Sequence, residues 1–137
     1  MTFRPDFPET KYRAEVVRVI DGDTFEVEVD LGFRVMRSMR IRLLGVDTPE
    51  LRRGSAESKK KGAEARAWVE DLILHRWVLI DSTTTKSFDR WVAAVYFYVR
   101  DPVSLHEKEG QPIWYDLADA LVTAGHAKPT YRPRPQR

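Results

Sequence analysis

The sequence predicts an α+β fold in which a five-stranded closed β-sheet packs against two α-helices. Three runs rich in β-branched and aromatic residues precede one amphipathic stretch, and two further runs of this kind precede a second. The chain has 137 residues, of which 42% are hydrophobic, and this suffices for one domain with a substantial core. A barrel of five strands is the most economical arrangement of these elements.

The first three predicted strands span residues 11–20, 24–31 and 33–46. The first two flank Asp21 and Gly22, a dipeptide favoured in tight turns between antiparallel strands. Apolar residues at alternate positions of the second strand indicate one buried face. In the third strand, we expect Arg40 and Arg42 to point away from the apolar side chains of Val35, Met39, Ile41 and Leu43. The glycine that follows, Gly45, is expected to form a bend.

Apolar residues then recur at intervals of three and four, which predicts an amphipathic helix over residues 57–75 that packs on the sheet. Residues 77–81 and 91–99 are rich in β-formers and predict a second hairpin, followed by a loop over 100–112. A second helix is predicted over residues 114–125, where a glycine ends it and later prolines prevent its continuation. The first helix is expected to bury the side chains of Ala65, Trp68, Val69, Leu72 and Ile73.

We expect one domain over residues 11–131, between an N-terminal extension of residues 1–10 and a basic, proline-rich tail of residues 132–137. The polar start has no apolar segment of signal-peptide length, and no later run approaches the length of a membrane span. The expectation is therefore a soluble cytoplasmic protein without a membrane partner, with secretion of a processed form left open.

The composition excludes some classes of site. The chain has no cysteine, so disulfides, thiolate metal sites and cysteine nucleophiles are ruled out. The net charge of +2 at pH 7 does not by itself indicate a nucleic-acid partner. Its distribution is more informative, because residues 52–62 and 128–137 concentrate cations while acids gather in two short motifs. A basic rim around an acidic pocket suits a polyanion bound together with a cation.

The two acidic motifs are "VIDGDTF" and "RLLGVDTPE". Asp23 and Asp47 are hard oxygen donors, and Thr48 adds a carbonyl and a hydroxyl, which suits Ca²⁺ or Mg²⁺ better than zinc. So few protein ligands would leave positions for water and for a phosphate oxygen. Glu50 could accept a proton from such a water. Two arginines, Arg42 and Arg90, match a phosphodiester and the charge that it gains in the transition state.

Each residue also has an ordinary structural interpretation, which spacing alone favours. Asp21 and Asp23 fit a plain hairpin turn, and "DTPE" fits a helix start. Arg42 fits the solvated face of a strand, Arg90 a turn, and the lysines at 59–61 a soluble helix entrance. The large aromatic residues are interpreted as core or half-buried sheet; they are Trp68, Trp77, Trp91, Tyr96, Tyr98 and Trp114. No role is assigned to the histidines, which are His75, His106 and His126.

The order of the motifs along the chain favours the functional interpretation of these residues over the structural one. "VIDGDTF", "RLLGVDTPE", a lysine-rich approach to "GAEARAW", "FDRWVAAVY" and "ALVTAGHAK" together resemble the staphylococcal nuclease (thermonuclease) family, from about residue 12 to 131. The first two motifs are highly specific as a pair, and the last is weaker. This resemblance implies an OB-fold barrel with helices packed on it. It also implies Ca²⁺-dependent cleavage of DNA and RNA between phosphorus and the 5′-oxygen, which leaves 3′-phosphate ends.

The resemblance also implies roles for individual residues. Asp23 and Asp47 match carboxylate ligands of calcium, and Thr48 matches a carbonyl ligand. Glu50 matches a residue assigned either as the general base or as the group that orients the water. Arg42 and Arg90 match the pair that binds phosphate and stabilises the transition state. Positions outside this centre are implied to support the turn or to contact the nucleic acid; they are Asp21 for the turn, and Lys59, Lys60 and Tyr131 for the substrate.

The sequence departs from the family pattern at three places. Phe88 and Asp89 replace a Tyr-Gly pair before Arg90, which removes a hydroxyl and adds a carboxylate. The segment 100–113 is longer than the usual turn, and the sequence has no counterpart of a third helix. The alternative function is a non-catalytic nucleic-acid-binding module on the same barrel. Recruitment of a partner through 100–113 is compatible with either function, and the oligomeric state is left open.

Overall fold

The computed structural model of the protein describes residues 10–87, 90–98 and 113–130. A long antiparallel hairpin, β1 (Lys11–Asp21) and β2 (Thr24–Asp30), is followed by β3 (Met36–Leu43) and the short β4 (Val46–Asp47). The helix α1 (Ala56–Ile73) leads to a second hairpin, β5 (Trp77–Ser87) and β6 (Arg90–Tyr98). The described chain ends with β7 (Trp114–Asp116), α2 (Leu117–Thr123) and β8 (Lys128–Pro129).

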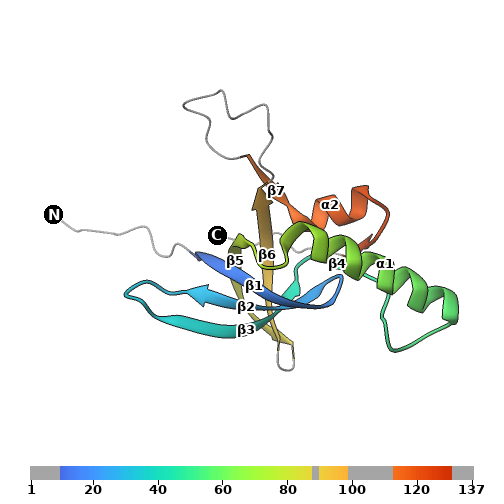
Figure 1. Ribbon diagram of the computed structural model, residues 1–137, viewed down its shortest axis with the longest axis horizontal. Coiled ribbons are helices and arrows are strands. Elements are labelled where there is room, and N and C mark those ends of the chain that lie inside the picture. The colour runs from blue at the N-terminus through green and yellow to red at the C-terminus, as the bar shows by residue number, and fades with distance from the viewer. Residues whose placement is uncertain (1–9, 88–89, 99–112, 131–137) are drawn as a thin grey trace.

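Five of these strands close into a barrel, as the sequence predicts. Antiparallel pairing gives the order β3-β2-β1-β5-β6, and a parallel pairing between β3 and β6 closes the sheet. The closing register places Ile41 opposite Trp91 and Leu43 opposite Ala93. This arrangement is an OB-fold barrel of the α+β class. Both helices lie on the same side of it, with α1 reaching out beyond the barrel (Figure 1).

The core fills the barrel and the space beneath the helices. Phe25, Ile41 and Leu43 are almost completely buried inside the sheet. The predicted first helix begins and ends within two residues of α1, and Ser55 caps it by accepting a hydrogen bond from the Ser58 backbone N–H at 3.1 Å. Most of its predicted apolar face is buried, and the remainder is half-buried. Within the described residues, no helix is long and apolar enough to cross a membrane.

The structure corrects several predicted boundaries. The third strand begins at Met36, not at residue 33, so Val35 is 49% exposed in the turn before it, and Gly45 separates it from β4 with a φ of 87°. The polar residues after 81 continue β5 to Ser87, because they pair with β6. Trp114–Asp116 pair with β6 as β7, so α2 starts only at Leu117. Such short strands as β4, β7 and β8 have too few residues for a periodic pattern. The predicted loop 100–112 lies outside the described residues.

The predicted burial of aromatic residues is partly wrong. Trp68, Trp91 and Tyr96 are half-buried, whereas Trp77 and Trp114 are about two-fifths exposed and Tyr98 is over one-third exposed. The exposed rings are paired at the surface. The Arg13 guanidinium lies 5.2 Å from the centre of the Trp77 ring, and Tyr98 meets Trp114 edge to face at 5.1 Å.

Candidate metal and phosphate site

The two acidic motifs meet at the Asp23 carboxylate, which is only 8% exposed as a residue. Its Oδ1 accepts a hydrogen bond from the Thr24 hydroxyl at 3.0 Å. Its Oδ2 accepts one from the backbone N–H of Thr48 at 2.9 Å, although 25 residues separate the two. The first motif therefore does more than turn the chain: its buried carboxylate holds the second motif in place.

Arg42 lies between the two aspartates. Its Nη1 donates to the carbonyl oxygens of Leu43 at 3.0 Å and Val46 at 2.8 Å, and lies 3.4 Å from Asp23 Oδ2. Its Nη2 donates to Asp47 Oδ1. The Arg42 side chain is 18% exposed, so it does not lie on a solvated face. One guanidinium thus brings the Asp23 and Asp47 carboxylates to a common place.

Arg90 joins this group from β6, the strand that pairs with β3 to close the barrel. It is half-buried at the start of β6, and its Nη1 donates to the Thr24 hydroxyl oxygen at 3.5 Å. Thr24 pairs with Arg42 across β2 and β3, so the two guanidiniums approach the same threonine and aspartate pair. Barrel closure between β3 and β6 is what brings these arginines together, although 48 positions separate them in the sequence.

The donors present fit a hard divalent cation. Two carboxylates and a threonine carbonyl are oxygen ligands of the kind that calcium and magnesium prefer. The Thr48 hydroxyl oxygen is buried and has no hydrogen-bond partner among the described residues. Burial, and next the negative charge of Asp23, raise the pKa of the Asp21 carboxyl. No group of three or more His, Asp or Glu suited to a metal occurs within the described residues.

Glu50 follows Thr48 by two residues on the chain that leads to α1, and its negative charge is one of the weaker causes that raise the pKa of Asp21. The Glu50 side chain is exposed, and the peptide before it packs against α1 at Gly62. A Cβ on Gly62 would lie 2.7 Å from the Pro49 carbonyl oxygen and 3.1 Å from the Glu50 carbonyl oxygen. A Cβ on Gly22 would likewise lie 2.9 Å from the Thr48 Cγ2 atom. Both motifs are therefore packed as closely as a glycine allows.

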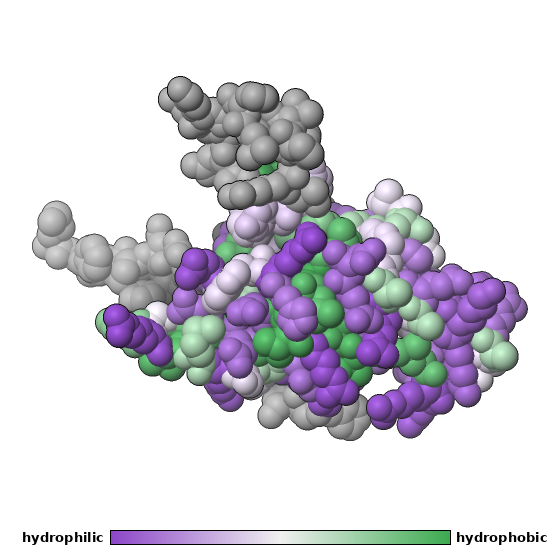
Figure 2. All heavy atoms as spheres, in the orientation of Figure 1, coloured by the Kyte–Doolittle hydropathy of each residue, from purple (hydrophilic) through white to green (hydrophobic). Residues whose placement is uncertain are grey.

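The remaining predicted site residues that the structure describes lie outside the group formed by Asp23, Arg42 and Asp47. Lys59 and Lys60 are exposed near the start of α1, at the end of the molecule that Figure 2 shows to be strongly hydrophilic. The Asp21 carboxylate accepts a hydrogen bond from the Leu51 backbone N–H, which links the turn to the chain after the second motif. Tyr131, Phe88 and Asp89 lie outside the described residues.

Sequence reasoning missed three residues that build the site. Thr24 connects Asp23 to Arg90, and Gly22 and Gly62 allow the close approaches. Gly62 left a signal, because a glycine inside a predicted helix costs about 1 kcal/mol relative to alanine and so calls for a packing reason.

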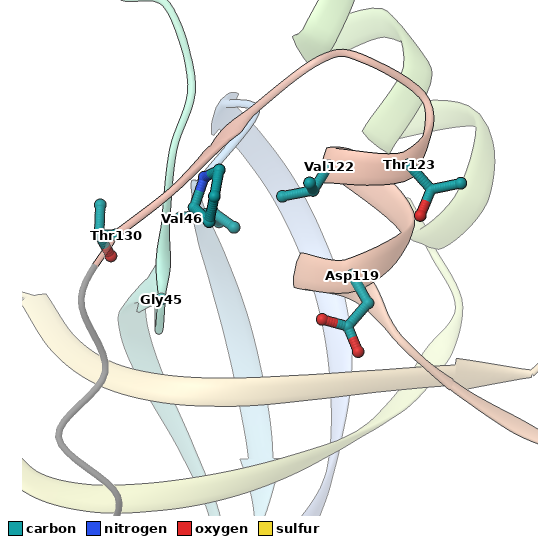
Figure 3. A pocket seen from close by; sticks show the side chains of 7 residues that line it. Gly45, Val46, Asp119, Val122, Thr123 and Thr130 are labelled. Atoms are coloured by element: carbon teal, nitrogen blue, oxygen red, sulfur yellow. The ribbon is translucent and has the colours of Figure 1, made fainter.

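A cavity of about 420 Å³ lies next to the second motif, where Gly45 and Val46 line it (Figure 3). It lies between α2 and the β4–β8 pair, and Asp119 is its charged lining residue among the described part of the chain. Asp119 belongs to the first turn of α2, where the helix dipole favours an acid, so a structural role accounts for it.

Comparison with known proteins identifies the family of this chain. A family described as "Staphylococcal nuclease homologue" matches residues 40–137, a range that contains Arg42, Asp47, Glu50 and Arg90. "Protein ParB" of Escherichia coli is 36% identical over 84 residues, which are 61% of this chain and 41% of that protein. "Micrococcal nuclease" of Shigella flexneri is 30% identical over 91 residues, 66% of this chain and 46% of that protein.

A third relative, "Probable endonuclease LCL3" of Leptosphaeria maculans, is 39% identical over 59 residues, 43% of this chain and 20% of that protein. The chain thus covers less than half of the length of each of these three relatives. The family match begins after Asp21 and Asp23, so it is the fold that joins these two acids to the matched residues.

Proposed function

Because this chain belongs to the staphylococcal nuclease homologue family, we propose that it is a calcium-dependent phosphodiesterase that cleaves DNA and RNA to 3′-phosphate ends. Two of its relatives carry names that describe nucleases. The observation that carries the proposal is the placement of the Arg42 guanidinium between the Asp23 and Asp47 carboxylates, with Arg90 linked to the same group through Thr24.

This arrangement supplies the two kinds of group that phosphodiester hydrolysis requires. Asp23, Asp47 and the Thr48 carbonyl would hold the ion, which when bound provides Lewis-acid polarisation of a phosphate oxygen and of a water. Glu50, which is exposed and follows Thr48 by two residues, would accept the proton of the attacking water or orient it. Arg42 and Arg90 can donate to non-bridging phosphate oxygens and stabilise the added charge of the transition state.

The direct test is cleavage of single-stranded DNA and of RNA with calcium, with magnesium or with a chelator. We expect cleavage with calcium and none with the chelator. Glu50→Gln removes the charge at constant shape and is expected to lower kcat by ~10²-fold or more. Glu64→Gln is the matched control, because Glu64 is an exposed acid on α1 outside the site. Equal cutting in every condition and variant would reject the proposal, and tight binding without cutting would favour the non-catalytic alternative.

Calcium alone is expected to stabilise the protein weakly. Two aspartates and one carbonyl give few protein ligands, so the affinity of the free site should be low and the melting temperature should rise only at high calcium or with a mononucleotide present. Differential scanning calorimetry over a calcium series measures this. The exposed Asp47 provides the control, since Asp47→Asn should abolish the rise while leaving the fold intact. Strong stabilisation by micromolar calcium alone would contradict an open site.

A further inference from the structure

The turn between β2 and β3 presents an aromatic ring in an unfavourable backbone conformation. Three consecutive residues have positive φ: Gly32 at 79°, Phe33 at 54° and Arg34 at 60°. For a bulky side chain such as phenylalanine this conformation is an outlier that costs on the order of 1–2 kcal/mol. Phe33 is nevertheless 100% exposed, so burial does not compensate for the cost. Such strain at an exposed position suggests a functional constraint.

The turn is well defined by hydrogen bonds. The Leu31 backbone N–H donates to the Val35 carbonyl at 2.9 Å, and the Val35 N–H donates to the Gly32 carbonyl at 2.8 Å. The Asp30 carboxylate accepts from the Gly32 N–H at 2.8 Å and pairs with Arg13 at 3.0 Å. The ring is therefore held out from the barrel on a fixed support.

The charges of the hairpin tip favour an anionic partner. Arg34 and Arg37 are exposed, and neither makes an ion pair within the described part of the chain. The acid of the turn, Asp30, is already paired with Arg13. The tip thus offers two free guanidiniums beside one free ring. Exposed apolar residues surround them, namely Leu31, Val35 and Met36.

The hairpin is continuous with the candidate site. β3 runs from Met36 at the tip to Arg42 and Leu43 at the site. At ~3.3 Å per residue, Arg37 and Arg42 are roughly 17 Å apart along the strand, which several nucleotides can span. Because five positions separate them, the two side chains lie on opposite faces of β3, so a strand that contacts both must cross the edge of the hairpin. The hairpin ends on the side of the molecule away from the outer end of α1 (Figure 1). A nucleic-acid strand bound at both the site and the tip would therefore run along β3.

We propose that this tip is an accessory surface for single-stranded nucleic acid, in which Phe33 stacks on a base and Arg34 and Arg37 contact phosphates. Aromatic stacking combined with guanidinium contacts is how proteins bind single strands without sequence preference. The inference rests on the proposed function for its substrate class and extends it to how far the substrate is held. Free cations and the strand that leads to Arg42 favour nucleic acid over a membrane or a second copy of the chain.

The decisive variant is Phe33→Gly, because glycine accepts positive φ and so relieves strain while removing the ring. We expect an unchanged or higher melting temperature together with a 5- to 10-fold weaker affinity for a fluorescent single-stranded oligonucleotide, a loss of about 1 kcal/mol typical of stacking. Anisotropy in a chelator measures this binding without cleavage. The ratio of kcat/KM on a long oligonucleotide to that on a dinucleotide should fall by a similar factor.

A second pair of variants tests the charges. Arg34→Gly together with Arg37→Ala should weaken binding and reduce its salt dependence, because fewer phosphates are neutralised. Arg76→Ala, which removes an exposed arginine between α1 and β5, should leave both unchanged. Unaltered oligonucleotide affinity in the Phe33 and arginine variants, no oligonucleotide binding by the native chain, or a loss confined to vesicle binding or dimerisation would overturn the inference. If the native chain cleaves nothing yet shows Phe33-dependent binding, only the proposed function fails.

Discussion

Arg42→Ala is expected to lower kcat by ~10²- to 10³-fold, the loss typical of one preorganised donor in a transition state. It should also destabilise the fold by about 2 kcal/mol. The guanidinium donates to the Leu43 and Val46 carbonyls and contacts the Asp23 and Asp47 carboxylates, and its removal takes one donor from each of these acceptors. For a chain of this size we expect a fall in melting temperature of roughly 5–10 °C.

Arg90→Ala is the matched comparison. It should lower kcat by a similar factor, because Arg90 also faces the proposed phosphate position. Its described polar contact is one long hydrogen bond to Thr24, so the melting temperature should change by less than that of Arg42→Ala. Arg42→Lys keeps the charge but loses the fork, and should recover part of the stability with little activity. The test is to measure kcat, and the melting temperature by calorimetry, for all three variants. Native-like kcat in either alanine variant would contradict it.

The sequence predicts most of the barrel because each long strand has its own periodic signal. β1, β2 and β6 are rich in β-branched or aromatic residues, and α1 has helical spacing over five turns. The short strands could not be predicted, because two or three residues pair only where tertiary packing presents a free edge. Trp114–Asp116 show this, since helical spacing predicts that they belong to α2, whereas β6 offers them an edge.

The candidate site could be predicted as a set of residues, but its geometry could not. The Asp23, Arg42 and Asp47 positions follow from two motifs and from a family resemblance. That one guanidinium contacts both carboxylates depends on β2–β3 register and on the bend at Gly45, which no local pattern specifies. Spacing alone favours a plain turn at Asp23, whereas its carboxylate holds the Thr48 backbone. The sequence predicts Thr24 only as a strand residue, whereas in the structure its hydroxyl accepts a hydrogen bond from Arg90.

Gly62→Ala is expected to lower kcat by ~10²-fold without unfolding the protein. The new methyl group would lie 2.7 Å from the Pro49 carbonyl oxygen, so either α1 or the chain carrying Glu50 must move. Displacement of a catalytic group by about 1 Å can cost a factor of this size. The free energy of unfolding should fall by at most about 2 kcal/mol, because alanine gains about 1 kcal/mol of helix propensity while the overpacking costs ~1–3 kcal/mol.

Two further variants decide whether Gly62 acts through Glu50. Ala67→Gly lies on the exposed face of the same helix and should lose about 1 kcal/mol of stability while keeping kcat, which separates helix stability from positioning. If Gly62 only positions Glu50, the double variant with Glu50→Gln should be no less active than Glu50→Gln alone, because the group being positioned is already lost. Additive losses in the double variant would show that Gly62 acts elsewhere. Native kcat in Gly62→Ala would show that α1 yields to the methyl group without moving Glu50, since the backbone contact at 2.7 Å cannot persist as it stands.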